Sequence, residues 1–590
     1  MNTKHESIAD IPLIIEFCKR LNIQHVIEKN IKTHGNQTGL TNSQLVLAWI
    51  AHILSENNHC KSPVEDWQKN HRLTLEGLLG TQIKDNDFED CRLGRLLEKF
   101  AEDSVWHGIE KSFFQDSFSI LELDTSAPVA FKQNESIENG IISTIKLDGT
   151  TAYGHHEIID GGIMQKGWSK DHRSDLPQIK LMVSCEGNTG MQIASDVEAG
   201  NKNDDPLYIP IMQRTRAIVD TKGYLICGDC KMSSLENRTN FVENNEFFLA
   251  PLQLNKKLKK WMEDNLEEVF NEKKPLEIIS YIDNDEVKII GEGFEVAKIQ
   301  KSIEGHLQWN ERYLIIKSHE HADQEIKKFK NKIYKLQKEL MKCESKLHAT
   351  PEEAQQELLK KIKDSMESIP EFLLNVESII ELNESEYERS EKKRKGTYKI
   401  KKYRAKITNV VVNEEMLASI SKKIGWRIYV TNAEKSILTL PSAYLFFRRT
   451  MYVIEIGFHN LKDYLNISPL YVRDQNQILG MTRLLMLALK ILTLMTAELR
   501  SNMKKEKVQL VGLYPGQPSR KHSTPTAQSV LKYFVSQKLA IIGYKVGDMW
   551  NWEMTQITAT CRSILKLLKL PENIFEKLTA SVALRNESNP

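Results

Sequence analysis

Three acidic residues stand in sequence contexts that could bring carboxylates to one site. Asp148 lies within the strand-like run LDGTTAYG, Asp229 follows a short apolar run in LICGDCKM, and Glu455 belongs to the periodic stretch MYVIEIGFHNLKDYL. Converging carboxylates repel one another unless a cation neutralises them, and hard oxygen ligands select Mg²⁺ or Mn²⁺. Two such ions can activate a water or hydroxyl and stabilise the leaving oxygen of a phosphoryl transfer. The residue types fit this chemistry, whereas their spacing along the chain neither supports nor excludes it.

The stretch 451–465 is expected to form a helix. Its apolar residues recur at helical spacing and form one stripe, made of Ile454, Phe458, Leu461 and Leu465. Glu455 and Lys462 lie about two turns apart at the edge of that stripe, so both could face a site at the surface of the core. A satisfied ion pair or a solvated helix face would explain the same pattern. The two aspartates upstream favour the functional interpretation.

Composition limits the class of protein. The chain has 590 residues, 41% hydrophobic and 27% charged, which suffices for several domains with a sizeable core. A formal net charge of +2 provides no global attraction for nucleic acid, so any basic surface must be local. The eight cysteines are too dispersed for a disulfide framework and the amino terminus shows no signal peptide, so a cytoplasmic protein is expected. The apolar run 484–495 is short and contains Lys490, which favours a buried helix over a membrane span.

Periodicity divides the chain into five expected regions, 1–115, 116–252, 253–420, 421–505 and 506–590. The first is all-helical, with Thr41 as a helix N-cap, and suits a DNA-binding or a packing domain equally well. The second is the first part of an α/β core, and the third is an insertion with a helical hairpin and a basic segment. The fourth is the end of the core with the helix of Glu455, and the fifth is a helical tail.

The second region carries the pattern of a mixed sheet. Strands are expected at 118–124, 144–153, 180–185, 191–200, 224–229 and 246–251, and helices at 206–220 and 233–245. Antiparallel-type strands followed by alternating helices and strands make a mixed α/β layer. Asp148 falls on the first strand of this core and Asp229 at the carboxyl end of a later one, where α/β sheets collect chemistry. Asp124 is the alternative for the first acid.

The insertion carries an amphipathic or coiled-coil pattern. Apolar residues from Ile326 to Leu347 follow alternating spacings of three and four, for about three heptads. Thr350 and Pro351 mark the start of a second helix, so a helical hairpin is expected. The first helix could pack within its own chain or form a dimer interface. The segment 384–406 has a basic second half with two tyrosines, and is interpreted as solvated surface or, alternatively, as a phosphate-tracking segment.

Several blocks resemble, in the same order, those of bacterial insertion-sequence transposases with a DDE triad. The blocks are LDGTTAYG, GWSKDHRSDLPQIKLMVS, DVEAGNKNDDPLYIP, GDCKM and IEIGFHNLKDYL. More narrowly, the chain resembles a group related to the IS4 superfamily that has an all-helical amino-terminal domain. The resemblance implies an α/β fold with a ribonuclease-H-like mixed-sheet catalytic core, interrupted by a largely helical insertion. It also implies Mg²⁺-dependent transposition on the terminal inverted repeats of the element.

Motif by motif, the resemblance assigns the catalytic acids. They are Asp148, Asp229 and Glu455, and together they would bind two Mg²⁺ (or Mn²⁺) ions. Lys462 keeps its spacing from Glu455 and is implied to position a DNA phosphate.

The last block departs from the family's pattern before the glutamate. Where the family has an arginine this chain has Met451, and the family's tyrosine position holds Arg448. Arg449 is the neighbouring cation that could substitute for the missing arginine. In the polar loop 167–178, Trp168 and the basic residues could touch DNA near a cleaved end, although packing or turn roles are equally compatible. The expected DNA-binding residues are Lys462, Arg449, Lys170 and Arg173.

The sequence therefore predicts a DNA transposase that cleaves the ends of an insertion sequence and joins them to target DNA. The expected partners are the terminal inverted repeats, the target DNA and a second copy of the chain in a synaptic homodimer, in the bacterial cytoplasm at the nucleoid and not at a membrane. Two alternatives stay open: a catalytically decayed DNA-binding protein, and a metal-dependent nuclease of the same fold. A helical scaffold with no DNA role is a third, because the net charge is near neutral.

Overall fold

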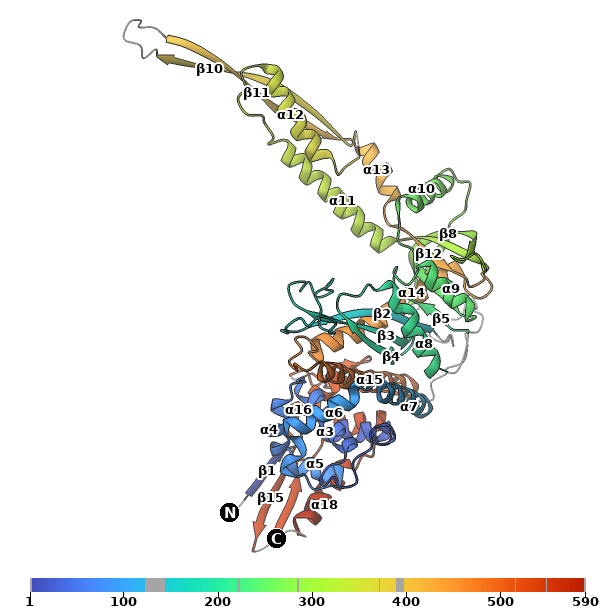
Figure 1. Ribbon diagram of the computed structural model, residues 1–590, viewed down its shortest axis with the longest axis vertical. Helices are drawn as coiled ribbons and strands as arrows, with labels where there is room; N and C mark the ends of the chain where they lie inside the picture. The colour runs from blue at the N-terminus through green and yellow to red at the C-terminus, as the bar shows by residue number, and fades with distance from the viewer. Residues whose placement is uncertain are drawn as a thin grey trace. The chain divides into compact units, whose positions relative to one another are not determined.

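The chain forms two compact units in the computed structural model, which describes residues 3–121, 144–219, 223–283, 286–370, 372–388, 397–514, 516–547 and 549–587. The first unit comprises Met1–Gln253, Lys298–Arg312 and Val430–Pro590, and the second comprises Leu254–Ala297 and Tyr313–Tyr429. The elements of both are labelled in Figure 1. Every residue predicted to act in the site belongs to the first unit.

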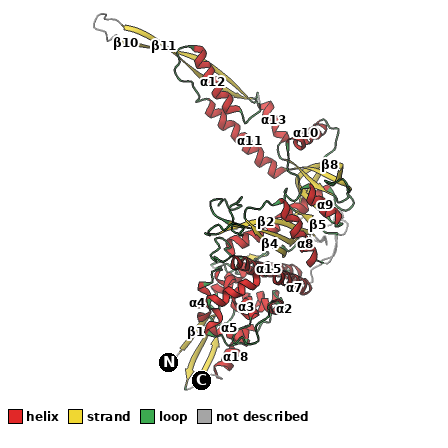
Figure 2. Ribbon diagram, viewed as in Figure 1, coloured by secondary structure: helices red, strands yellow, loops and turns green. Residues whose placement is uncertain are grey.

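The region before the sheet is helical, as predicted (Figure 2). After a short strand, β1 (Thr3–Ser7), come α1 (Ile11–Arg20), α2 (Ile23–Asn30), α3 (Asn42–Glu56), α4 (Ser62–Asn70), α5 (Arg72–Leu79), α6 (Asp90–Ala101) and α7 (Asp103–Leu121). Thr41 caps α3 as predicted: its hydroxyl accepts from the amide of Gln44 at 3.2 Å, and its own amide donates to the Gln44 side chain at 2.9 Å. This capping box satisfies amides that the first turn of a helix leaves unpaired.

The strand predicted at 118–124 is wrong over its described part. α7 continues to Leu121, and Asp124 lies outside the described residues. The rings of Phe114 and Phe118 pack with centroids 4.0 Å apart, a contact that fits the i, i+4 spacing of a helix. A short run of alternating apolar residues did not distinguish the end of a buried helix from a strand.

The core of the first unit is a mixed sheet. β2 (Thr144–Tyr153), β3 (Gln178–Glu186) and β4 (Gln192–Ala199) are antiparallel, and β5 (Leu225–Cys227) and β6 (Phe247–Pro251) add parallel strands beside β2. α8 (Tyr208–Ile218) precedes β5, and α9 (Leu235–Glu243) precedes β6. The strands in the order β4-β3-β2-β5-β6 lie wholly in this unit. The chain after β6 adds β7 (Glu277–Asp283), β8 (Glu286–Lys301), β9 (Gln308–Ser318) and β12 (Trp426–Thr431). The predicted α/β mixed-sheet core is confirmed.

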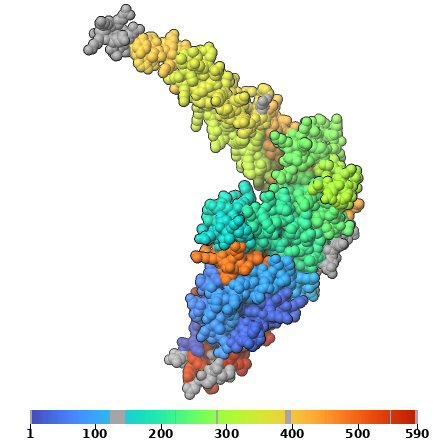
Figure 3. Space-filling model, viewed as in Figure 1, coloured from blue at the N-terminus to red at the C-terminus, as the bar shows by residue number. Residues whose placement is uncertain are grey.

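α14 (Leu440–His459) is the helix predicted around Glu455. It begins after Thr439, whose hydroxyl accepts from the amide of Ser442 at 3.3 Å, and it runs into a π-helical turn at Asn460–Tyr464. The hydroxyl of Tyr464 donates to the carbonyl of Leu54 in α3 at 2.8 Å. Figure 3 shows the orange surface of this segment between the blue amino-terminal helices and the teal strands. The helix is therefore fixed to the amino-terminal region as well as to the sheet.

α15 (Gln475–Glu506) is the apolar helix predicted near 476–500. By length and composition it is the one helix in the described ranges that could cross a membrane, but 89% of its most apolar window is buried inside the protein. Lys490 within it donates to the carbonyls of Gln192 and Ile193, at 2.7 and 3.1 Å, and pairs with Glu110 at 3.3 Å. These partners satisfy a buried ammonium, so α15 is built as a core helix.

The carboxyl-terminal region contains strands that the sequence did not reveal. The expected helices are α16 (Ala527–Ser536) and α17 (Ala559–Leu567), and α18 (Ile574–Glu587) follows them. Between α16 and α17, β15 (Ala540–Val546) pairs with β16 (Met549–Met554) and with β1 at the other end of the chain. Pairing over so long a separation leaves no local signal in the sequence.

The second unit has its own core. Its elements include α10 (Lys256–Phe270), α11 (His319–Leu340), α12 (Pro351–Met366), β10 (Leu374–Glu388), β11 (Thr397–Val412) and α13 (Glu414–Lys423). Side chains of α11, α12 and β11 form one buried cluster that includes Ile333, Leu340, Leu358, Ala405 and Ile407. The heptad residues of α11 therefore pack within their own chain.

Two predictions for this unit are corrected in detail. The heptad helix ends at Leu340, short of Leu347, whereas α12 begins after Thr350 as predicted. The basic half of 384–406 belongs to β11, which pairs antiparallel with β10; residues 389–396 lie outside the described residues. No strand was expected there. The interpretation as solvated surface holds for Lys399, Lys401 and Lys402, which are exposed, whereas Tyr403 and Ala405 pack in the buried cluster.

Candidate active site

Asp148 lies on β2 and Asp229 just after the neighbouring parallel strand β5, at matching positions. β2 and β5 pair in register up to Lys146 and Cys227, and each aspartate follows two residues later. The Asp148 side chain is only 11% exposed, and its Oδ1 accepts from the amide of Gly149 at 2.7 Å. The sheet register therefore brings together two aspartates that lie 81 positions apart in the sequence.

Asp229 is fixed in a turn that follows β5. Its Oδ1 accepts from the amides of Lys231 and Met232, at 2.9 and 3.3 Å. The same oxygen accepts from the hydroxyl of Tyr208 in α8 at 2.6 Å. Burial raises the pKa of Tyr208 well above its usual value, and the charge of Asp229 adds to the effect, so the hydroxyl stays a donor. Sequence reasoning missed Tyr208, because only the fold places α8 beside this turn.

The positive charge near Asp148 does not fully offset its burial and the negative charge of Asp229. Burial raises the pKa of the Asp148 carboxyl, and the nearby charge of Asp229 raises it further, while Lys170 and Lys146 lower it. A buried carboxylate facing a second carboxylate is stabilised by any added cation. The arrangement can therefore hold a divalent cation between hard oxygen ligands.

Lys146 is a second residue that sequence reasoning missed. It precedes Asp148 by two positions on β2, so both side chains leave the same face of the strand. It is fully buried, and burial lowers the pKa of its ammonium. Its Nζ contacts the Sδ of Met451 and lies 5.0 Å from the ring centroid of Phe447, both in α14. A lysine two positions before the candidate acid, in the same strand-like run, was the available signal.

The loop after β2 is connected to the site by two ion pairs. Lys170 Nζ lies 3.3 Å from Asp148 Oδ1 and also donates to the carbonyl of Gly149. The next residue, Asp171, pairs with Lys462 at the carboxyl end of the Glu455 helix. Two of the predicted DNA-binding residues thus meet acidic groups of the protein itself.

The other predicted residues of this loop lie at its surface. Arg173 pairs with Asp175 at 2.9 Å, and its guanidinium lies 5.2 Å from the ring centroid of Tyr153. Trp168 is 83% exposed, which is unusual for a residue of its size. Both side chains lie outside the core and are accessible to a large ligand.

Glu455 lies on the correct face of α14 but is exposed. It follows Met451 by four positions and precedes Lys462 by seven, so all three share one side of the helix. Met451 contacts Lys146, and Lys462 contacts Asp171, so this side faces β2 and its loop. Arg449 is in α14, and its side chain lies outside the described residues.

Two of the three predicted metal ligands, Asp148 and Asp229, lie at matching positions, and the third does not join them. In the part of the chain that the structure describes, no group of three or more His, Cys, Asp or Glu side chains is placed to hold a metal ion. Asp148 and Asp229 fit a divalent cation by donor chemistry and by their mutual repulsion, whereas Glu455 is not part of a ready-made cluster. The assignment of Glu455 as the third ligand stays a prediction.

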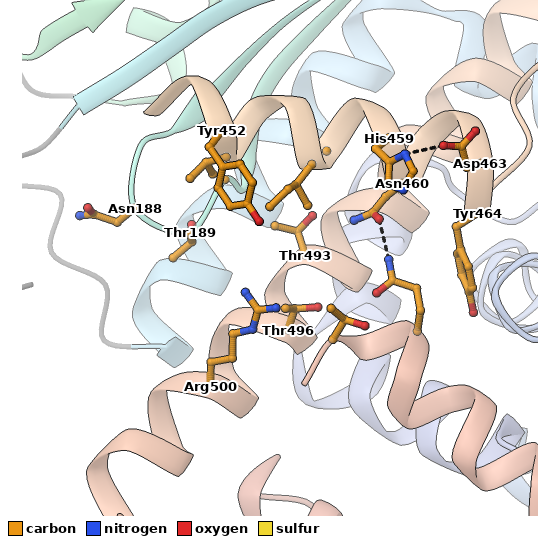
Figure 4. Close-up of a pocket in the computed structure, with 16 residues that line it drawn as sticks. Asn188, Thr189, Tyr452, His459, Asn460, Asp463, Tyr464, Thr493, Thr496 and Arg500 are labelled. Atoms are coloured by element: carbon orange, nitrogen blue, oxygen red, sulfur yellow. Dashed lines mark hydrogen bonds and ion pairs between the residues drawn. The ribbon is translucent and has the colours of Figure 1, made fainter. Parts of the chain in front are cut away.

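A neighbouring face of α14 borders a cavity of about 570 Å³ (Figure 4). Its polar lining includes Tyr452, Thr189, Thr496 and Arg500, and the guanidinium of Arg500 donates to the carbonyls of Pro525 and Thr524 at 2.9 and 3.2 Å. This cavity is separate from the aspartates, because the residues of α14 that line it do not include Met451, Glu455 or Lys462.

Comparison with known proteins gives the class of the chain. The family described as "Transposase DDE domain" matches residues 140–491, more than half of the 590 residues, and the chain belongs to this family. Residues 3–111 match a "Domain of unknown function (DUF4277)". No curated protein is significantly similar to the chain in sequence. A solved structure of the piggyBac transposase synaptic complex with hairpin DNA is similar with a TM-score of 0.35 and 8% identity, over 98% of this chain and 87% of that one. Similarity at this level indicates neither the fold nor the function of this chain.

The protein is thus a transposase of the DDE class by family membership, as the sequence predicted. The family match contains the two aspartates, the Glu455 helix and the whole second unit, because it runs from 140 to 491.

Proposed function

We propose that the protein cleaves the ends of a bacterial insertion sequence and joins them to target DNA by metal-dependent phosphoryl transfer. The observation that carries the proposal is the Asp148–Asp229 pair, held by the register of β2 and β5 within the part of the chain that matches the transposase family. A buried carboxylate such as that of Asp148, beside a second carboxylate, is costly to a fold unless the pair binds a cation.

Asp148, Asp229 and Glu455 are the proposed ligands of two Mg²⁺ or Mn²⁺ ions. These ions would supply activation of the attacking water or 3′-hydroxyl and stabilisation of the leaving oxygen. Tyr208 and the amides of the turn keep the Asp229 carboxylate in place. Glu455, exposed on α14, would complete the set by turning its side chain toward the pair.

The proposed DNA contacts surround this set. Lys462 would hold a phosphate next to the scissile bond, since it lies on the same side of the helix as Glu455. Arg449, Lys170 and Arg173 would contact the backbone on either side. The amino-terminal helices would bind the terminal repeats, and two copies of the chain would act together in a synaptic complex in the bacterial cytoplasm.

We also propose five functional regions. They are the amino-terminal domain 1–115, the first part of the catalytic core 116–252, the insertion 253–420, the end of the core 421–505 and the carboxyl-terminal region 506–590.

Single alanine substitutions test the proposed acids. Asp148→Ala, Asp229→Ala and Glu455→Ala should each abolish Mg²⁺-dependent cleavage of DNA that carries the sequences flanking the coding region, while binding of the same DNA persists. Asp160→Ala, which removes an exposed acid nearby, is the matched control and should cleave normally. Full cleavage by all three site variants would contradict the assignment.

A joining assay separates transposition from simple hydrolysis. A transposase should transfer a pre-cut end, with its free 3′-hydroxyl, into a plasmid in the presence of Mg²⁺. Cleavage without joining would favour the metal-dependent nuclease. Duplex binding without Mg²⁺-dependent nicking would favour the catalytically decayed DNA-binding protein.

A further inference from the structure

Two adjacent residues of opposite charge, Lys170 and Asp171, contact a proposed metal ligand and a proposed phosphate-binding residue. Lys170 places its ammonium 3.3 Å from Asp148 Oδ1, and Asp171 places its carboxylate on the Nζ of Lys462. The side chains of Asp148, Asp171 and Lys462 are 11%, 16% and 23% exposed, whereas that of Lys170 is 37% exposed. The pairs connect the strand and the helix through a single peptide unit.

Each contact has the chemistry of a ligand of the reaction. The ammonium of Lys170 neutralises a carboxylate that is proposed to bind a divalent cation. The carboxylate of Asp171 presents anionic oxygens to a lysine that is proposed to bind a DNA phosphate. We propose that residues 169–173, the surrogate loop, close the resting site by occupying the cation position with Lys170 and the phosphate position with Asp171. The inference rests on the proposed function, since it uses its assignment of Asp148 and Lys462.

The closed loop is held incompletely, which suits a contact that must open. The Oδ2 of Asp171 is buried and has no hydrogen-bond partner among the described residues. A buried carboxylate oxygen without a donor costs free energy. Asp171, one of the two residues that close the site, therefore destabilises the closed state. The loop has further hydrogen bonds. The amide of Lys170 donates to Thr151 Oγ1 at 3.1 Å, Ser169 Oγ accepts from the amides of Asp171 and Arg173 at 3.2 Å each, and the Ser169 carbonyl accepts from the amide of His172 at 3.4 Å.

The base of the loop, by contrast, is fixed. Gln165 and Gln178 exchange backbone hydrogen bonds of 3.1 and 3.0 Å, and a Cβ at Gly167 would lie 2.0 Å from the carbonyl oxygen of Gly200. Movement is therefore confined to the segment beyond Gly167. Because Lys170 and Asp171 are neighbours, displacing one pulls on the other.

This linkage has a thermodynamic consequence. A cation at Asp148 that displaces Lys170 also frees Lys462, and a phosphate at Lys462 that displaces Asp171 also frees Asp148. Metal and DNA must then each strengthen the binding of the other by the same factor. The loop would keep an unloaded site closed until both ligands are present.

Manganese binding by the full-length protein, measured from the electron paramagnetic resonance of free Mn²⁺ without DNA, tests the loop. Asp171→Asn should tighten Mn²⁺ binding about two- to fivefold, the range that release of a partly exposed ion pair provides. The direction is diagnostic, because removing a nearby negative charge would by itself weaken binding of a cation. Asp160→Asn, the same charge change on an exposed loop, should leave the affinity unchanged or slightly weaker.

Binding of a short fluorescent DNA duplex of arbitrary sequence in EDTA supplies a second readout. Asp171→Asn should tighten binding about two- to fivefold and steepen the salt dependence by about one phosphate contact. In a Lys462→Ala background the same substitution should have no effect, whereas a general charge effect would persist.

The outcomes distinguish failure of the proposed metal site from failure of the surrogate-loop proposal. If Asp148→Asn binds Mn²⁺ as wild type does, the proposed metal site is wrong and the inference falls with it. If Asp148→Asn loses binding while Asp171→Asn is unchanged or weaker, only the surrogate loop is wrong. A DNA effect that persists with Lys462→Ala also overturns it.

Discussion

The two aspartates and Glu455 are presented by different kinds of structure. Asp148 and Asp229 are fixed by strand register, backbone amides and the Tyr208 hydroxyl, and Asp148 is desolvated. Glu455 stands exposed on a helix whose position depends on the amino-terminal helices and on Lys146. The sheet supplies a preformed, electrostatically strained pair, and the helix supplies a side chain that can move. The consequence is that substitutions at the two places should act on different properties.

The largest effect is expected where the helix rests on the sheet. Met451→Arg would set a second cation against the buried ammonium of Lys146, which now contacts the Met451 sulfur. An unpaired buried charge costs several kcal/mol, so we expect a loss of about 3 kcal/mol in the free energy of unfolding, measured by urea titration.

Two companion variants make this result specific. Met451→Leu keeps an apolar side chain of similar volume and should cost less than about 1.5 kcal/mol. Lys146→Met combined with Met451→Arg should recover part of the loss, because only one cation then remains. Equal losses in all three would show that volume, not charge, decides the contact.

A smaller effect is expected at the hydrogen bond that fixes Asp229. Tyr208→Phe removes a buried donor to a carboxylate and should lower the free energy of unfolding by about 2 kcal/mol. The control is Tyr452→Phe, an exposed tyrosine on α14, which should change it by less than about 0.5 kcal/mol. A Tyr208→Phe protein as stable as wild type would mean that this hydrogen bond does not fix the Asp229 carboxylate in the folded protein.

The pH dependence of stability should distinguish the buried acid from the exposed one. The pKa of Asp148 is raised in the folded protein, so its favourable contribution is fully present below the unfolded value, near 3.8, and is lost as pH rises through the folded pKa. In metal-free buffer, Asp148→Asn should therefore gain stability relative to wild type as pH rises from about 4 toward neutrality. Chemical denaturation at several pH values would measure it. A difference between the two proteins that stays constant with pH would show that burial does not raise the pKa of this carboxyl.

The smallest effect is expected at Glu455. Glu455→Gln should change the free energy of unfolding by less than about 0.5 kcal/mol at any of these pH values, because the side chain is exposed. A loss above about 1 kcal/mol would show instead that Glu455 is already held in the fold.

The sequence predicted much of the framework that carries the candidate residues, because strands and helices have local periodic signals. β2 was expected at its observed bounds, and α12 and α15 were expected close to theirs. α14 was expected from residue 451 but begins at Leu440. What failed depended on contacts between distant segments. The end of α7, the β1–β15 pair and the β10–β11 hairpin are decided by packing partners that no short window contains. Tyr208 and Lys146 were missed for the same reason, since their importance comes only from what the fold puts beside them.

The contact between Lys146 and Met451 joins residues 305 positions apart, with the whole second unit encoded between them. During synthesis at the usual rates, roughly 15 to 60 s would pass between the emergence of the strand and that of its helix. Throughout that interval the nascent sheet would carry a lysine and two acids without the helix that covers them. The order of the chain thus makes assembly of the candidate active site one of the last events in its folding, completed only after the inserted unit has been made.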